Sequence, residues 1–304
     1  FIANRVRRRK GLFVFFLIAG RLMYIPVAFL PVLFPSLRAD LAMGVIVPVI
    51  AASSVLINIG GPFWFSWMAD VIPGRIRNAY WGTRSAWLQF TYIVAFLLLA
   101  AFGSFFPVSA LTAYPVIATF SVIAGVVDIL LFLKVDEADN VVVKDRSIFG
   151  EILAPFFDRD YRRFVLFHLV WSAMVMSSAS FMMVYVVNKL GYGTTGASLI
   201  WLFCGVGTIF TARMWGKLAD KHGHKPVITI CVCCKPMIVA VFLFVTPNSA
   251  IYVLPVAFMI DSIWNAGMGV AQNGNMMKFA PRENRAMFLT AITGYNGNPS
   301  LVEV

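Results

Sequence analysis

The chain has 304 residues, of which 60% are hydrophobic and 13% are charged, and its formal net charge is +11. Soluble domains average about 45–50% apolar and about 25% charged residues, so this chain has too little charge to solvate a globular surface. Disorder needs the opposite bias. The composition therefore excludes a soluble enzyme. The positive charge must be placed along the chain before it can suggest an acidic partner.

Long apolar runs recur along the chain and are separated by short polar breaks. Each is close to the ~20 residues that cross a bilayer core of ~30 Å as a helix. Barrel strands would be about 10 residues long and would alternate in polarity, which these runs do not. The sequence therefore predicts an all-α, polytopic membrane protein. Eight spans are complete and a ninth begins near Ala286, the eight being 11–35, 41–68, 85–106, 110–133, 163–187, 196–214, 226–246 and 250–272.

Basic residues divide unequally between two alternating sets of breaks. One set holds 21 of the 25 Lys and Arg residues and consists of breaks 1–10, 69–84, 134–163, 213–225 and 278–285. The opposite set holds only Arg38 and Lys189. Short loops rich in Lys and Arg stay in the cytoplasm. We therefore expect the chain start and the central loop to be cytoplasmic, and the net charge to reflect topology, with no nucleic-acid partner.

The four cysteines lie inside apolar runs, so no disulfide framework is indicated. Three of them, Cys231, Cys233 and Cys234, could be read as a soft-metal site, but that stretch has no converging His or carboxylate. Small buried packing residues are the favoured interpretation. We expect neither a metal site nor a cofactor.

Two short patterns recur in the two halves of the chain. The first pair is Ile2–Arg5 and Leu218–Lys221, and the second is Pro73-x-x-x-Arg77-x-x-Tyr80 and Pro281-x-x-x-Arg285-x-x-Phe288. The offsets are similar, at 216 and 208 residues. Restoring the spans that each half lacks gives six plus six helices. Parallel halves of this kind are a repeat architecture of secondary transporters.

The segment Gly216–Lys225 resembles the G-x-L-a-D-x-x-G-r-[RK] loop signature of the major facilitator superfamily. In that family the loop joins the second and third helices of each half. Asn4–Lys10 resembles a degenerate first copy, with Asn4 where the family has Asp, and Trp67–Arg84 resembles a bacterial permease subgroup. The resemblance covers essentially the whole chain, from the end of helix 2 to the start of helix 11.

The resemblance implies a 6+6 helix bundle from which roughly the first two and the last helices are missing. Residues 1–134 would be the rest of the first half (helices 3–6), 135–162 a cytoplasmic linker, and 163–304 the second half (helices 7–10 and the start of 11). It also implies a monomeric permease of the bacterial inner membrane. Such a permease moves a small solute by rocker-switch alternating access, and its coupling to a proton or ion stays open.

Two other functions stay open, a membrane-embedded enzyme acting on lipid-linked substrates and a transport-inactive sensor or scaffold on the same fold. Enzymes of that kind usually place His, Asp and Glu clusters at the interface, whereas the loops here are basic with isolated acids. We therefore expect no enzymatic activity.

Charged residues within the spans are candidates for the solute or ion pathway, because a charge at mid-bilayer costs at least ~2.5–3.5 kcal/mol. Arg21 and Lys235 occupy the same repeat position, and both structural pairing and solute contact stay open for them. Asp128 lies near the inner end of its span and could simply meet the cytosol. Asp261 is the strongest candidate.

Asp261 heads a polar stripe, since Asp261, Asn265, Met268 and Gln272 follow one another at i, i+4, i+7 and i+11. Asn273 adds further polarity. By the resemblance this span is the tenth helix, which lines the cavity. An interhelical polar cluster that holds the bundle together is the alternative.

Three other residues are candidates for the pathway. His168 and Trp171 lie in span 163–187, where a His can titrate near neutral pH and an aromatic ring can stack on a solute. A packed core His is the alternative for His168. Asn58 lies in span 41–68, in which Gly60-Gly61-Pro62 is expected to introduce a kink.

The basic loops supply a candidate conformational latch. Asp220 can accept hydrogen bonds from the positive end of a helix, Gly216 permits close helix approach and Gly223 permits a positive φ. By the resemblance this loop latches the two halves together, and we expect Asp220 to face the start of the helix after Arg77. Simple positive-inside anchoring is the alternative. The remaining latch candidates are Lys225, Asp70, Arg84 and Arg285.

Overall fold

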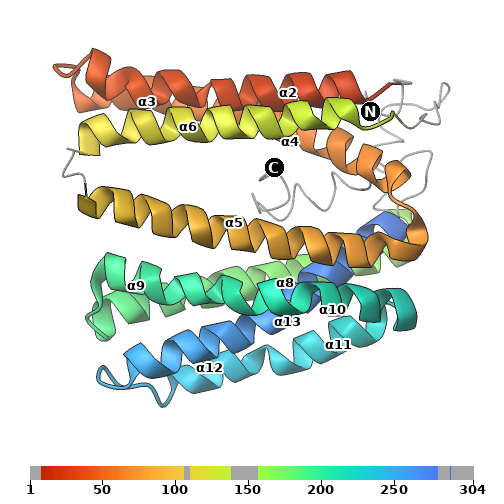
Figure 1. Cartoon of the computed structure of the whole chain (residues 1–304). Helices are drawn as coiled ribbons and strands as arrows, with labels where there is room; N and C mark the ends of the chain where they lie inside the picture. Colours follow the sequence, from red (N-terminus) through yellow and green to blue (C-terminus); the bar gives the residue numbers. More distant parts are fainter. Residues whose placement is uncertain (1–7, 106–109, 138–156, 280–287, 289–304) are drawn as a thin grey trace. The chain divides into compact units, whose positions relative to one another are not determined.

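The computed structural model describes residues 8–105, 110–137, 157–279 and 288. These residues form α-helices joined by turns and by short 3-10 and π segments, and no strand occurs among them (Figure 1). The predicted all-α class is confirmed. The start of the predicted ninth span near Ala286 and most of the predicted linker lie outside the described residues.

Seven helical segments in the described part are long and apolar enough to cross a membrane, and each overlaps one predicted span. They are Lys10–Leu33, Asp40–Val71, Ala113–Lys134, Tyr161–Lys189, Gly196–His222, His224–Phe242 and Ala250–Lys278. The remaining predicted span, 85–106, overlaps α5 (Arg77–Phe105), which begins with a polar turn. The protein is therefore a multi-pass membrane protein.

Contacts group the described residues into two compact units. The first comprises 8–71, 103–105, 110–137, 157–165 and 288, and the second comprises 72–102 and 166–279. Most of α5 thus groups with the second unit, although the predicted first half runs to residue 134. The predicted halves and linker stay a prediction.

The first unit is built from four long helical elements and a short 3-10 turn. These are α2 (Lys10–Leu22), α3 (Tyr24–Leu33), α4 (Ala39–Val71), α6 (Ala110–Leu131) and η2 (Phe132–Lys134). Buried aromatic side chains fill its core: the ring centroids of Phe13 and Trp67 lie 5.3 Å apart, and Phe132 lies 6.0 Å from Trp67. The helix α4 continues through Gly60-Gly61-Pro62 as a single element.

The second unit contains the remaining elements. They are η1 (Gly74–Ile76), most of α5, most of α8 (Arg159–Val184), η3 (Tyr185–Lys189), α9 (Gly193–Leu202), η4 (Phe203–Gly205), α10 (Val206–His222), α11 (His224–Cys234), α12 (Pro236–Phe242) and α13 (Ala250–Phe279). The central helix is α13, which packs against α10, α11 and η4. Trp215, Cys231 and Met268 belong to the core between these helices. Cys231 is therefore a buried packing residue.

Two local features of the sequence set the breaks in this unit. Gly223 has φ +86 and separates α10 from α11, in a conformation that L side chains rarely adopt. Pro236 lacks an amide hydrogen and starts α12, so the helical run is interrupted at Lys235. These two breaks position the loop and the site described below.

Candidate functional site

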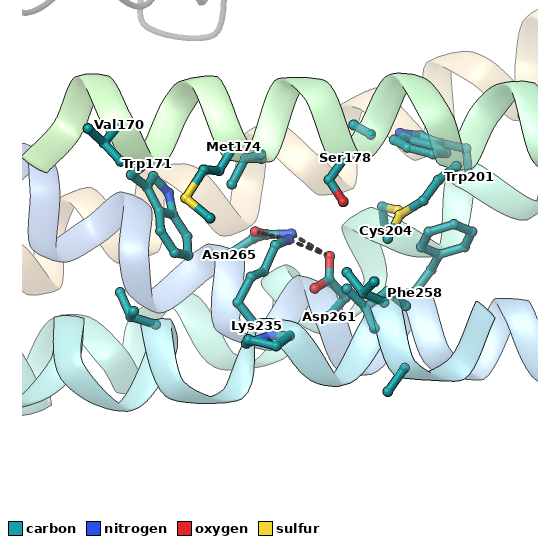
Figure 2. Close-up of a pocket in the computed structure, with 18 of the residues that line it drawn as sticks. Val170, Trp171, Met174, Ser178, Trp201, Cys204, Lys235, Phe258, Asp261 and Asn265 are labelled. Atoms are coloured by element: carbon teal, nitrogen blue, oxygen red, sulfur yellow. Dashed lines mark hydrogen bonds and ion pairs between the residues drawn. The ribbon is translucent and has the colours of Figure 1, made fainter. Parts of the chain in front are cut away.

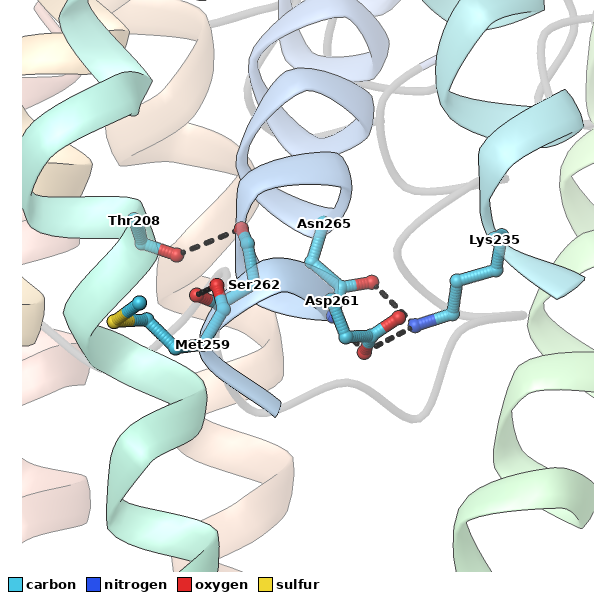
Figure 3. Close-up of polar contacts among 6 residues, drawn as sticks. All are labelled: Thr208, Lys235, Met259, Asp261, Ser262 and Asn265. Atoms are coloured by element: carbon cyan, nitrogen blue, oxygen red, sulfur yellow. Dashed lines mark hydrogen bonds and ion pairs between the residues drawn. The ribbon is translucent and has the colours of Figure 1, made fainter. Parts of the chain in front are cut away.

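The orientation of α13 is fixed on one side by small and hydroxyl residues. The Thr208 hydroxyl of α10 donates to the Ser262 carbonyl oxygen at 3.2 Å, and the Ser262 hydroxyl donates to the Met259 carbonyl oxygen at 2.7 Å (Figure 3). Any side chain at Gly207 would overlap the Met259 carbonyl oxygen, so α10 and α13 approach closely there. This packing turns Asp261, the neighbour of Ser262, toward α11 and α12.

A closed triangle of polar contacts forms on that side of α13. The Lys235 ammonium lies 2.8 Å from Asp261 Oδ2 and 2.8 Å from Asn265 Oδ1 (Figure 3). Asn265 Nδ2 donates to Asp261 Oδ2 at 2.9 Å. Sequence analysis selected Asp261 and Asn265 as one stripe and Lys235 separately, and the structure brings all three together.

The break in the helical run explains why Lys235 reaches α13. Lys235 lies between α11 and α12, with its backbone amide donating to Cys231 and the ring of Pro236 directly after it. A charged residue in a membrane helix is tolerated when it pairs inside the protein. At this junction the lysine side chain reaches across to the two acceptor oxygens on α13 (Figure 3).

The triangle lines a cavity of about 760 Å³ between α8, α9, η4, α11, α12 and α13 (Figure 2). Its wall is otherwise largely apolar, and Trp171, Trp201 and Phe258 supply aromatic surface. Ligand sites commonly have this composition, with a few polar groups that orient the ligand within a hydrophobic cleft. The triangle is therefore placed to meet a bound molecule.

One carboxylate oxygen of this site is unsatisfied. Asp261 Oδ1 is buried and has no hydrogen-bond partner within the described residues, while Oδ2 accepts from both Lys235 and Asn265. The Asp261 side chain is only 8% exposed, whereas that of Lys235 is 18% exposed. Most buried polar atoms in folded proteins have a partner, so this oxygen needs an explanation.

The predicted stripe on α13 does not meet the cavity along its whole length. Asp261 and Asn265 line the cavity, but Met268 is 3% exposed and packs in the apolar core with Trp215. Gln272 and Asn273 are half-buried and do not line it. Met268 therefore serves packing, and a pathway role of Gln272 and Asn273 stays a prediction.

The other pathway candidates differ in whether they line the cavity. Trp171 of α8 lines the cavity, whereas His168, one turn earlier, is 5% exposed and does not. Asn58 of α4 is exposed and donates to the Ser54 carbonyl oxygen of its own helix at 2.7 Å. Of these three residues, only Trp171 joins the triangle at the cavity.

Arg21 occupies the repeat position equivalent to Lys235 but has different surroundings. Its guanidinium extends from α2 onto α6, where it fills the space that a side chain at Gly125 would need. Asp128 lies one turn further along α6. Arg21 therefore packs in the contact between α2 and α6.

Asp220 caps the start of α5. Its Oδ2 accepts the backbone amide of Ala79 at 2.9 Å, and its Oδ1 accepts both the amide of Asn78 at 3.2 Å and the Asn78 side chain at 2.7 Å. A carboxylate at a helix N-terminus satisfies free amides and meets the positive end of the dipole. This is the contact that the sequence predicted for Asp220.

Glycines bring α10 and α13 close to this cap. A side chain at Gly216 of α10 would overlap the Asn78 carbonyl oxygen, and one at Gly274 of α13 would overlap the Asn78 side chain. His224 Nε2 lies 3.1 Å from Asn78 Oδ1, which can only accept, so His224 is the donor. Sequence analysis missed Asn78 and His224. The only sequence signal was that Asn78 lies within the Pro73–Tyr80 pattern and His224 within the Gly216–Lys225 loop signature.

The remaining latch candidates lie in different surroundings. Lys225 is exposed, and the Arg84 guanidinium lies 5.4 Å from the ring centroid of Trp81 in its own helix. Arg77 is half-buried at the first turn of α5, and Arg285 lies outside the described residues.

Asp70 forms a second polar cluster, in the first unit. Arg9, which is 2% exposed, donates to Asp70 Oδ2 and to the Ser66 hydroxyl, both at 2.5 Å. This buried contact joins the start of α2 to the end of α4. Arg9 was not selected from the sequence, because it lies in a run of basic residues at the chain start.

Comparisons with known proteins agree with this architecture. The family model for the Major Facilitator Superfamily matches residues 1–298. The chain belongs to this superfamily. Two crystal structures titled as a bacterial homologue of the iron transporter ferroportin in the outward-facing state, one of them with soaked iron, are similar to it. Their sequence identities are 13% and 12%, and their TM-scores are 0.64 and 0.66.

These similarities extend over 98% and 99% of this chain and over 75% and 76% of the solved ones. No curated protein matches the chain. At such low identity the solved structures show the fold alone. Superfamily membership and this fold make the protein a membrane transporter for a small solute, and they point away from an enzyme.

No group of three or more His, Cys, Asp and Glu side chains is placed to hold a metal ion in the described part of the chain. The Asp261 and Asn265 oxygens that face the cavity already hold the Lys235 ammonium.

Proposed function

We propose that this transporter moves its solute by rocker-switch alternating access, with the triangle of Asp261, Lys235 and Asn265 as part of the solute site. The observation that carries the proposal is the buried ion pair on the wall of a cavity of about 760 Å³ between membrane helices. Charges within a membrane protein are costly and mark solute or ion pathways. A pair that served only to hold helices together would not need to face a cavity.

The Asp220 cap is a second observation that supports alternating access. By the sequence repeat, α5 belongs to the first half and the Asp220 loop to the second. The hydrogen bonds of Asp220 to Asn78 and Ala79 therefore join the two proposed halves, and contacts group most of α5 with the second unit. We propose that these bonds hold one state of the transport cycle and break when the halves rock apart.

The proposed orientation follows from the basic loops. The Asp220 loop and the Pro73–Arg84 segment belong to the set that holds 21 of the 25 basic residues. We propose that this set faces the cytoplasm of a bacterial cell, with the protein in the inner membrane. The latch would then close the cytoplasmic side.

The structurally similar bacterial protein was solved with soaked iron, but we do not carry a metal substrate over to this chain. The Lys235 ammonium occupies the position between Asp261 Oδ2 and Asn265 Oδ1 where a cation would bind. A metal ion would have to displace it and leave a buried ammonium without its carboxylate, which is costly.

The test is uptake of labelled solutes by the full-length protein in proteoliposomes, with and without imposed proton and sodium gradients. Time-dependent accumulation is expected, and Asp261→Asn should reduce it, with Met268→Leu as the matched control on the same helix. Turnover of a lipid without solute flux would favour the membrane-enzyme alternative. Solute binding without flux would favour a sensor.

A further inference from the structure

We infer that the solute is an organic anion with an apolar body, whose anionic group binds Lys235 and Asn265. This inference rests on the proposed function and adds the chemical class of the solute. It follows from which hydrogen-bonding atoms of the triangle still have free capacity, and from how accessible they are.

The accessible polar atoms of the triangle are donors. An ammonium has three N–H groups, and Lys235 directs two of them at Asp261 Oδ2 and Asn265 Oδ1. The Asn265 amide directs one of its two N–H groups at Asp261. Lys235 and the exposed Asn265 therefore each keep one N–H for a ligand. The free acceptor, Asp261 Oδ1, is buried behind them.

An anion can bind without breaking the resident ion pair, whereas a cation cannot. A carboxylate would accept the third Lys235 N–H and the second Asn265 N–H while Asp261 stays in place. An ammonium ligand would need Asp261 and would expel the lysine cation into an apolar wall, which leaves a buried charge uncompensated. Charge-assisted bonds between an ammonium and a carboxylate are also among the stronger polar contacts.

The rest of the cavity fits an apolar body. Trp171, Trp201 and Phe258 supply aromatic faces, and Met174 and Leu243 supply adaptable aliphatic surface (Figure 2). The volume of about 760 Å³ lies within the range of sites that hold organic molecules and far exceeds that of an inorganic anion.

The test compares three probes that share one body and differ in charge, namely phenylacetate, phenethylamine and phenethyl alcohol. Their affinities for the full-length protein in detergent are measured by thermal shift and by calorimetry. Phenylacetate is expected to bind about 10- to 100-fold more tightly than the other two, because one charge-assisted contact differs. Equal or tighter binding of phenethylamine would overturn the inference.

Variants identify the responsible group. Lys235→Met should abolish the preference for phenylacetate, and Lys235→Arg should keep it. Because Lys235→Met leaves a buried carboxylate unpaired, the double variant Lys235→Met/Asp261→Asn tests the same point in a site without a net charge. Phenylacetate binding by this double variant at the wild-type affinity would contradict the inference.

Transport measurements distinguish a failure of this inference from a failure of the proposed function. Proteoliposomes that accumulate phenethylamine through an Asp261-dependent route would uphold a transporter and overturn the anion class. Preferential phenylacetate binding that depends on Lys235, with no flux of any solute, would uphold the anion class and contradict transport.

Discussion

The ion pairs Arg9–Asp70 and Lys235–Asp261 both join apolar helices, and they differ in their access to a ligand. The pair of Arg9 and Asp70 in the first unit encloses its cation: the guanidinium is 2% exposed and is also bonded to Ser66, while the carboxylate is 22% exposed. The pair of Lys235 and Asp261 in the second unit lines a cavity, and its ammonium is 18% exposed. An enclosed pair can stabilise a helix contact, whereas a pair on a cavity wall can also bind a solute.

The largest expected effect is on the enclosed pair. Arg9→Met should lower the free energy of unfolding by about 3–5 kcal/mol, because it removes two hydrogen bonds of a charged group, to Asp70 and to Ser66, each worth about 1.5–3 kcal/mol. Denaturant titration of the full-length protein in mixed micelles measures this. The double variant Arg9→Met/Asp70→Asn should recover part of the loss. Unchanged stability of Arg9→Met would show that the pair does not hold the helices.

For the pair at the cavity, we expect a smaller loss of stability than for the Arg9–Asp70 pair, together with a loss of solute uptake. Lys235→Met should lower the free energy of unfolding by about 1.5–3 kcal/mol, because Asp261 keeps its bond from Asn265. Solute uptake should fall at least about tenfold, the equivalent of one charged hydrogen bond. The same titration and proteoliposome uptake measure both quantities. Full uptake in a folded Lys235→Met protein would remove this residue from the site.

The Asp220 cap should affect the conformational equilibrium more than the fold. Asp220→Asn replaces one carboxylate oxygen with an NH2 group. This group cannot accept a hydrogen bond, so at least one N–H group that donates to Asp220 loses its acceptor. The change should cost about 1 kcal/mol of cap stability, or about fivefold in the ratio of the two access states. Distances between spin labels on the two halves of the full-length protein report this ratio. The exposed neighbour Lys221 provides the control variant Lys221→Ala, and the same ratio in both variants would contradict a latch.

The smallest effect is expected at Met268, which shares a helix face with Asp261 but packs in the core. Met268→Leu nearly conserves side-chain volume, so it should change the free energy of unfolding by less than about 1.5 kcal/mol. Solute uptake should stay close to that of the unchanged protein. A selective loss of uptake would place the cavity further along α13 than the structure does.

Sequence patterns predicted the helices because span length and composition follow from the bilayer itself. They also selected Asp261, Lys235 and Asp220, since charges in apolar runs and acids in basic loops are conspicuous. The pairing of Lys235 with Asp261 was not predictable, because it depends on how α13 is rotated against its neighbours. Thr208 and Gly207 set that rotation, and their contribution appears only once α10 is packed on α13.

Helical spacing alone also could not separate Asp261 and Asn265, which line the cavity, from Met268, which packs in the core. Met268 lies seven residues from Asp261, which is about 10 Å along the helix. Packed helices cross at an angle, so one face can meet a cavity at one level and another helix at the next. Asn78 and His224 were missed for a related reason, since their hydrogen bond forms over Gly274 of a distant helix.

The cap on α5 also allows the docking of the Asp220 loop to be followed through hydrogen exchange. The Asn78 and Ala79 amides are bonded to a carboxylate supplied by a residue more than 140 positions away in the chain. Their hydrogen–deuterium exchange should therefore be slow while the loop is docked and fast when it leaves. Exchange at these two amides then measures, without an attached spin label, how long each state of the transport cycle lasts.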